Sequence, residues 1–183
     1  MIAWSEQKPD FSRAPLDELS SRLPFTAACI VALNPGPWPL VAARKDTMDS
    51  VWAHLAEQSV EMGGLLIGSV HDLSREGSRF VIAISDHVRS VEFDGTGVSL
   101  RMDPEVWERA RLKAGEGRFV VGWYHSHPNL GVFFSGTDRR TQRAFFYHPH
   151  SAGVVIDPVR REEKWFVGGD SDELSPRQIL RYQ

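Results

Sequence analysis

The chain has 183 residues, 42% of them hydrophobic, and its 24 acidic and 21 basic side chains give a formal net charge of −3. This length suits one domain with a buried core, and the mild acidity argues against a protein that wraps a nucleic-acid backbone. The single cysteine, Cys29, excludes an internal disulfide and cysteine-based zinc sites, and no apolar run approaches the roughly 18 residues of a membrane span.

The hydrophobic pattern predicts strands and helices that alternate along the chain. In chain order we expect a strand over residues 25–33, a short strand over 40–43, a helix over 47–58, strands over 61–70 and 79–85, a helix over 103–114, a strand over 118–125, a helix over 135–147, and strands over 152–156 and 163–167. Asp103 and Pro104 suit the N-cap and first position of the second helix. Such alternation predicts a single α/β domain with a mixed β-sheet flanked by helices.

Composition divides the chain into three parts. Residues 1–24 mix charge, serine and proline without periodicity, and we expect them to be a lead-in segment. Residues 25–168 are the expected domain, and residues 169–183 are an expected polar C-terminal tail. Within the domain, residues 86–102 centre on Asp-Gly-Thr-Gly and predict a loop.

The most informative segment holds two histidines at the end of a predicted strand. His125 and His127 are two residues apart, so their side chains point to the same face of the strand. Ser135 follows, and Asp138 comes three residues later, where the intervening loop could return its carboxylate to the histidines. Two imidazole nitrogens and one carboxylate oxygen, with a fourth position open, are typical of a catalytic zinc site.

Two further side chains complete a hydrolytic site. Glu61 opens an apolar, glycine-rich strand, where a carboxylate needs a partner, and it is our candidate base for a zinc-activated water. Ser135 can donate a hydrogen bond to the oxyanion that forms when water attacks a carbonyl. Together these parts predict hydrolysis of an amide.

Each part also has an ordinary structural interpretation. A His-x-His pair in a strand can simply be packed, and Glu61 can be a strand-end charge. Ser135 and Asp138 have the spacing of a capping box at a helix start, which is compatible with a role in the site. The joint pattern should arise by chance in roughly one sequence per thousand of this composition, which favours the functional interpretation.

The same residues resemble a known family. The segments EMGGLLIG, opened by Glu61, and HSHPNLGVFFSGTD resemble the JAMM/MPN+ zinc isopeptidases, and residues 154–158 resemble the strand that follows the motif helix in that family. The similarity covers about residues 25–168. It implies a JAB/MPN fold of the cytidine-deaminase-like α-β-α type. It also implies a zinc ion held by His125, His127 and Asp138, with Glu61 as base and proton donor and Ser135 polarising the substrate carbonyl.

The resemblance further implies a substrate: the amide or isopeptide bond after the C-terminus of a ubiquitin-like protein. Residues 86–102 stand where the family clamps the substrate tail, and they carry no recognisable clamp signature. Two alternatives stay open, a non-catalytic MPN scaffold and a RadC-type relative that acts with DNA. We expect no nucleic-acid or membrane partner and, without a signal-peptide pattern, a cytoplasmic location.

Overall fold

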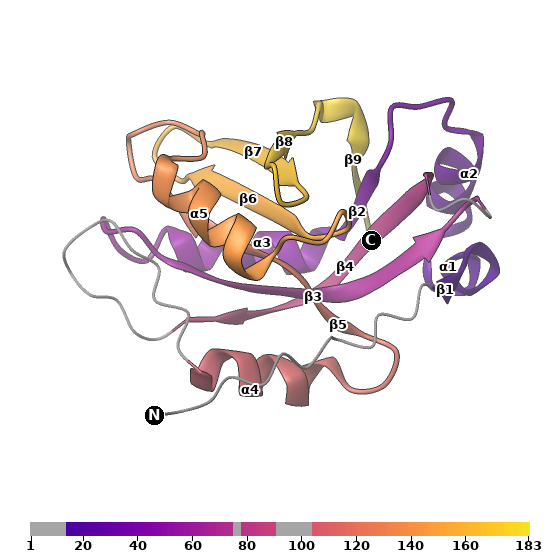
Figure 1. Ribbon diagram of the computed structural model, residues 1–183, viewed down its shortest axis with the longest axis horizontal. Coiled ribbons are helices and arrows are strands. Elements are labelled where there is room, and N and C mark those ends of the chain that lie inside the picture. The colour runs from indigo at the N-terminus through magenta and orange to yellow at the C-terminus, as the bar shows by residue number, and fades with distance from the viewer. Residues whose placement is uncertain (1–13, 75–77, 91–103) are drawn as a thin grey trace.

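The computed structural model describes residues 14–74, 78–90 and 104–183, and one mixed β-sheet forms its centre (Figure 1). Its elements, in chain order, are β1 (Ala14–Pro15), α1 (Leu16–Arg22), α2 (Phe25–Leu33), β2 (Leu40–Arg44), α3 (Lys45–Leu55), β3 (Gly63–Asp72), β4 (Phe80–Arg89), α4 (Pro104–Ala114), β5 (Phe119–Ser126), α5 (Gly136–Phe145), β6 (Ala152–Asp157), β7 (Glu162–Val167), β8 (Asp172–Glu173), the 3₁₀ turn η1 (Pro176–Gln178) and β9 (Ile179–Tyr182). None of the described helices is long and apolar enough to cross a membrane.

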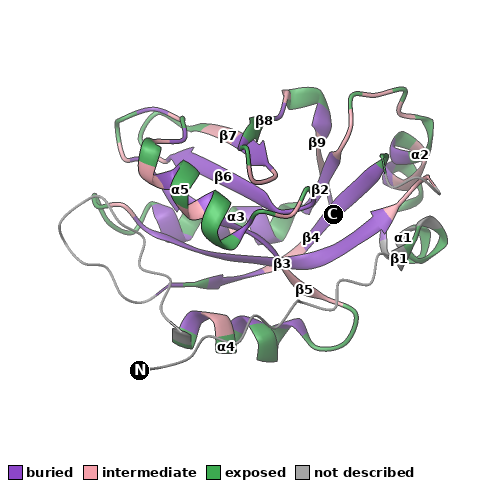
Figure 2. Ribbon diagram, in the orientation of Figure 1, coloured by how far each residue is buried: buried purple, intermediate pink, exposed green. Residues whose placement is uncertain are grey.

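The sheet follows the order β8-β7-β6-β5-β3-β4-β2-β9, with β1 added beside β3. The central strand β3 runs antiparallel to both β4 and β5, whereas β5 and β6 are parallel. Helix α3 packs on one face through Met48, Val51 and Leu55, and α4 packs on the other through Val106 and Ala110. Figure 2 shows the strands buried between these layers. The predicted α/β fold with a mixed sheet flanked by helices is confirmed.

The glycines of β3 are required by close contacts with neighbouring strands. A Cβ atom on Gly64 would lie 2.1 Å from the Val88 carbonyl oxygen, and one on Gly68 would lie 1.8 Å from the Ala83 carbonyl oxygen. Both distances are far inside van der Waals contact, so only glycine lets β3 pair with β4 at these positions. The strand predicted over residues 61–70 is confirmed as β3, and the structure places it in the middle of the sheet.

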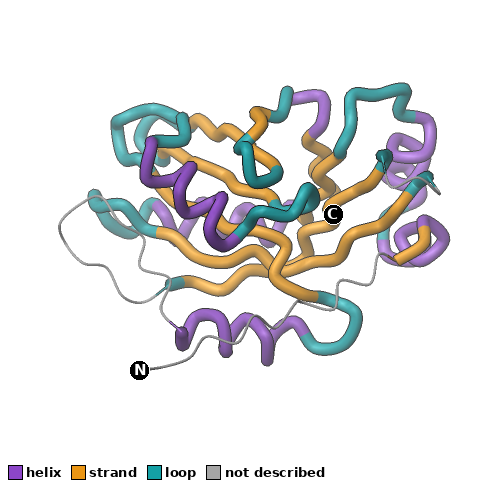
Figure 3. Tube along the Cα trace, viewed as in Figure 1, coloured by secondary structure: helices purple, strands orange, loops and turns teal. Residues whose placement is uncertain are grey.

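The predicted strand over residues 25–33 is wrong, because the segment forms helix α2 (Figure 3). Ala27 and Val31, four residues apart, are buried, whereas Phe25 and Leu33 are 82% and 80% exposed. Side chains four residues apart share one face of a helix. A short, continuous apolar run has no polar positions to reveal its period, so strand and helix could not be told apart from the sequence.

The expected tail and loop also differ from the structure. Within residues 169–183, β9 pairs in parallel with β2, and Leu174 and Tyr182 are buried. Of the loop expected over 86–102, the first residues continue β4 to Arg89, and residues 91–103 lie outside the described part. Of the lead-in, β1 pairs with β3 and residues 1–13 lie outside the described part. The division at residues 25 and 168 stays a prediction.

Candidate metal centre

His125 and His127 lie side by side where β5 ends, as the strand period predicts. They are 2% and 3% exposed, and their ring centroids are 4.8 Å apart. His125 stacks on Trp123, whereas His127 lies beside Phe133 with a centroid distance of 4.9 Å. Aromatic walls therefore hold both imidazoles in an environment largely closed to water.

Helix α5 brings Asp138 to the two histidines. Asp138 Oδ1 lies 3.2 Å from His125 Nε2, and Asp138 Oδ2 lies 3.6 Å from His127 Nε2. One ligand atom from each of the three residues falls within 4.8 Å of the others. The structure thus brings together the three side chains that the sequence pattern selected as metal ligands.

The donor set of this cluster fits a zinc ion. Both ring nitrogens of His125 are buried without a hydrogen-bond partner, since the 3.2 Å approach to Asp138 lacks hydrogen-bond geometry. Buried polar atoms without partners are rare and destabilising, and a cation between the three side chains would take one of these nitrogens as a ligand. Two nitrogen ligands and one carboxylate leave the fourth position of a tetrahedral site open.

Ser135 and Asp138 form the predicted capping box at the start of α5. The Asp138 backbone N–H donates to Ser135 Oγ at 3.2 Å, and the Ser135 backbone N–H donates to Asp138 Oδ2 at 2.6 Å. Burial raises the pKa of Asp138, but the contacts with His125 and Ser135 outweigh it and keep this pKa well below its usual value. Because Ser135 Oγ acts as an acceptor in the cap, its own O–H stays available as a donor.

Glu61 lies two residues before the start of β3, and its side chain approaches the same cluster. Its Oε1 atom lies 3.8 Å from His127 Nε2, and its side chain is 27% exposed. Burial raises the pKa of Glu61; His125 opposes this shift and the Asp138 carboxylate adds to it. A carboxylate with a raised pKa beside an open ligand position can take and return a proton.

Ser126 positions Glu61, and the sequence reasoning missed it. Ser126 Oγ accepts a hydrogen bond from the Met62 backbone N–H at 2.9 Å, and the Ser126 N–H donates to the Met62 carbonyl at 2.8 Å. These two bonds join the residue between the histidines to the residue after Glu61. Its position in the sequence could have revealed it. A residue between His125 and His127 points its side chain to the opposite face of the strand, away from the two imidazoles.

Asp157 is a second residue whose role the sequence reasoning missed. Its fully buried carboxylate accepts four backbone hydrogen bonds of 2.9–3.1 Å. Oδ2 takes the N–H of Gly131, and Oδ1 takes those of Asn129, Val159 and Arg160. Asp157 thereby anchors the loop between His127 and Ser135 to the turn after β6. A lone acid at the end of an apolar strand was the signal that could have revealed it.

The chain is similar to known proteins in sequence and in structure. A family model described as prokaryotic homologs of the JAB domain matches residues 44–167. The 26S proteasome regulatory subunit RPN11 of Eremothecium gossypii is 30% identical over 129 residues, which are 68% of this chain and 39% of that protein. The protein named ubiquitin carboxyl-terminal hydrolase RPN11 in Saccharomyces cerevisiae is 31% identical over 55% of this chain and 32% of its own length.

These curated relatives are longer proteins, and the chain spans between about a third and two fifths of their length. A solution structure from Desulfitobacterium hafniense matches 79% of this chain and 94% of its own, with a TM-score of 0.59 at 24% identity. The structural likeness supports the fold alone.

Proposed function

Because the chain belongs to the family of prokaryotic homologs of the JAB domain, we propose that it is a zinc-dependent hydrolase of amide bonds. Its substrate is the peptide or isopeptide bond after the C-terminus of a ubiquitin-like protein. The observation that carries this proposal is the buried cluster of His125, His127 and Asp138, with Glu61 Oε1 only 3.8 Å from His127 Nε2. The relative named as a ubiquitin carboxyl-terminal hydrolase supports the substrate class.

Each side chain has one task in the proposed reaction. His125, His127 and Asp138 would hold the zinc ion, which supplies Lewis-acid chemistry by lowering the pKa of water and polarising a carbonyl. Glu61 Oε1 takes a proton from the attacking water and passes it to the leaving amine nitrogen as the C–N bond breaks. The Ser135 hydroxyl donates a hydrogen bond to the carbonyl oxygen as negative charge develops there.

The test combines metal content with cleavage of fusions of a ubiquitin-like protein to a reporter, joined by a peptide or a lysine isopeptide bond. Wild type and Glu61→Gln should each carry about one zinc per chain, and His127→Ala should lose it. Glu61→Gln should cleave roughly 10²–10⁴ times more slowly than wild type, as expected for loss of a general base. Glu57→Gln is the matched control, because Glu57 is an exposed neighbour paired with Arg89.

A chelated protein that cleaves as fast as the zinc-loaded protein would refute the zinc-dependent reaction. Zinc binding without cleavage of any fusion would instead favour a scaffold whose metal site is structural. Cleavage that Glu61→Gln leaves unchanged would remove Glu61 from the reaction while retaining the hydrolase.

A further inference from the structure

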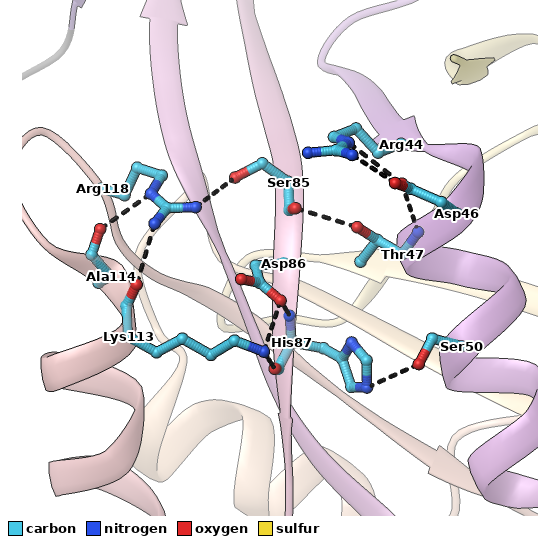
Figure 4. A network of polar contacts seen from close by, with 10 residues as sticks. All are labelled: Arg44, Asp46, Thr47, Ser50, Ser85, Asp86, His87, Lys113, Ala114 and Arg118. Carbon is cyan, nitrogen blue, oxygen red and sulfur yellow. Dashed lines mark hydrogen bonds and ion pairs between the residues drawn. The ribbon is translucent and has the colours of Figure 1, made fainter.

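A hollow of about 430 Å³ opens beside β4, on the other side of β3 from β5, the strand that carries His125. Its lining residues are Ser50, His87, Val88, Arg89, Arg109 and Lys113. Strand β2 pairs with β4 only as far as Ile84, so no described strand covers the edge of β4 from Ser85 to Arg89. Residues of α3, β4 and α4 line the hollow, so it lies beside this open edge. Figure 4 shows three of them, Ser50 on α3, His87 on β4 and Lys113 on α4.

Side chains satisfy the backbone groups on the open edge of β4. The His87 N–H donates to Asp86 Oδ1 at 2.8 Å, and Lys113 Nζ donates to the His87 carbonyl at 2.9 Å (Figure 4). Arg109 Nη2 donates to the Arg89 carbonyl at 2.8 Å. These contacts hold the charged groups of Arg109 and Lys113, one helical turn apart on α4, at carbonyls two residues apart on the same strand.

Both cations keep donors that the backbone does not use. An ammonium has three N–H donors and a guanidinium has five, and each group donates one to β4. Lys113 also pairs with Asp86 at 2.7 Å, whereas Arg109 has no ion pair among the described residues. Of the three cations that line the hollow, Arg89 is paired with Glu57 at 2.8 Å, so Arg109 brings the positive charge that no described carboxylate pairs.

His87 adds a buried polar atom to this wall. His87 is 8% exposed. Its Nε2 atom lies 3.5 Å from Ser50 Oγ, and its Nδ1 atom has no hydrogen-bond partner among the described residues. When Nε2 accepts the Ser50 hydroxyl, the neutral imidazole carries its proton on Nδ1 and needs an acceptor. Burial and then the nearby Lys113 lower the pKa of His87 to about 4, with Arg89 and His54 adding to this shift and Asp86 opposing it. The imidazole is thus neutral at pH 7 and sits in a positive potential.

We propose that this hollow is a binding site for a phosphate group, with Arg109 and Lys113 as its charged donors and His87 as a neutral residue of its wall. Phosphate oxygens match the forked donors of a guanidinium, and an ammonium serves as a further point charge. The volume of the hollow admits free phosphate or a small phosphate monoester. The phosphate group that these ligands share is what the site would recognise. This site is independent of the proposed hydrolase activity.

The proposal is tested by following the His87 ring signals by NMR during titration with inorganic phosphate at constant ionic strength. Millimolar phosphate should shift these signals in wild type, and Arg109→Gln should weaken binding about tenfold, as expected for loss of a charged hydrogen bond. Arg111→Gln is the matched control, since Arg111 lies on the same helix but pairs with Glu108 and does not line the hollow. Arg109 is exposed, so its substitution should leave the thermal midpoint nearly unchanged.

A parallel titration with phosphoserine distinguishes the source of the phosphate. Tighter binding of phosphoserine than of free phosphate identifies a monoester as the ligand, and the reverse order identifies the free ion. The absence of any phosphate-dependent shift, or equal weakening by Arg109→Gln and Arg111→Gln, would overturn the site. Neither result depends on zinc or on cleavage of a ubiquitin-like fusion.

Discussion

The indole of Trp123 lies flat against the imidazole of His125, with ring centroids 4.5 Å apart and planes 6° from parallel. Trp123 Nε1 donates a 2.6 Å hydrogen bond to Gln142 Oε1, and Gln142 is fully buried. Gln142 Nε2 in turn contacts, at 3.1 Å each, the carbonyl oxygens of Phe146, Ser151 and Gly168. One amide from α5 therefore orients the ring that supports a candidate ligand and ties together three segments around it.

Replacing Gln142 with methionine should lower both stability and zinc affinity. Gln142→Met keeps a similar volume but removes the acceptor of the Trp123 N–H and one donor to the three carbonyls, of which those of Ser151 and Gly168 keep backbone N–H partners. The free energy of unfolding should fall by roughly 1–3 kcal/mol. Zinc affinity should fall roughly tenfold, the lower range for loss of an outer-shell partner. Denaturant unfolding and a chelator-competition titration measure the two effects.

Gln178→Met is the control for this experiment. Gln178 is also buried and donates to the Pro39 carbonyl at 2.9 Å, beside β9. It should lose stability while its zinc affinity stays at the wild-type value. Equal zinc affinities for Gln142→Met and wild type would show that Trp123 does not orient His125.

Two substitutions separate the helix cap at Ser135 from its hydroxyl donor. Ser135→Ala should lose about 1 kcal/mol of stability through the cap, whereas Ser135→Gly should lose only a few tenths. Both lack the hydroxyl, so both should cleave a ubiquitin-like fusion roughly 10²–10³ times more slowly. Steady-state cleavage and thermal unfolding of the two variants supply the comparison. If instead Ser135→Gly cleaved the fusion nearly as fast as wild type and only Ser135→Ala were slow, the role of Ser135 would be limited to capping helix α5.

Asp157→Asn should disturb the loop between His127 and Ser135. An asparagine keeps one acceptor oxygen, but its NH₂ group must then face either the Gly131 N–H or the three N–H groups on the other side. A buried donor facing a donor costs roughly 1–3 kcal/mol. We expect a loss of stability of this size and, at a temperature where the variant is fully folded, a lower kcat.

Asp49→Asn serves as the reference for Asp157→Asn, because Asp49 is an exposed partner of Lys45 on α3. It should change stability by less than about 0.5 kcal/mol and leave kcat unchanged. A folded Asp157→Asn protein with wild-type kcat would restrict Asp157 to a purely structural role.

Because the imidazole of His87 is buried with a lowered pKa, we expect the free energy of unfolding to fall in mild acid. The pKa of His87 lies at about 4 in the folded chain, against 6.5 for an ordinary histidine, so the unfolded state binds the proton preferentially between pH 4 and pH 6.5. Stability from this group is fully present above pH 6.5 and declines as pH falls towards 4, by about 3 kcal/mol at most.

The measurement is the free energy of unfolding of chelated protein in phosphate-free buffer across this range, for wild type and His87→Gln. The variant should show a shallower decline between neutral pH and pH 4. Parallel pH profiles for the two proteins would contradict a depressed pKa at His87.

Short-range patterns allowed much of the candidate site to be predicted. The two-residue spacing of His125 and His127 places them on one face, because side chains alternate along any strand. The capping box between Ser135 and Asp138 is likewise local, since both hydrogen bonds close within one helical turn. The JAB/MPN fold, predicted from the motifs, is confirmed by the family match and by the observed sheet.

Contacts between distant segments required the tertiary structure. Glu61 meets His127 because β3 pairs with β5 in the register that sets Gly63 opposite His125, and no local pattern encodes that register. The same holds for β9, whose partner β2 lies far away in sequence, and for the hollow between α3 and α4. The sequence alone determined that His125 and His127 share one face, through the two-residue period of a strand. Long-range strand pairing and packing decided that the carboxylates of Glu61 and Asp138 lie beside these histidines. They also decided which side chains line the hollow at the open edge of β4.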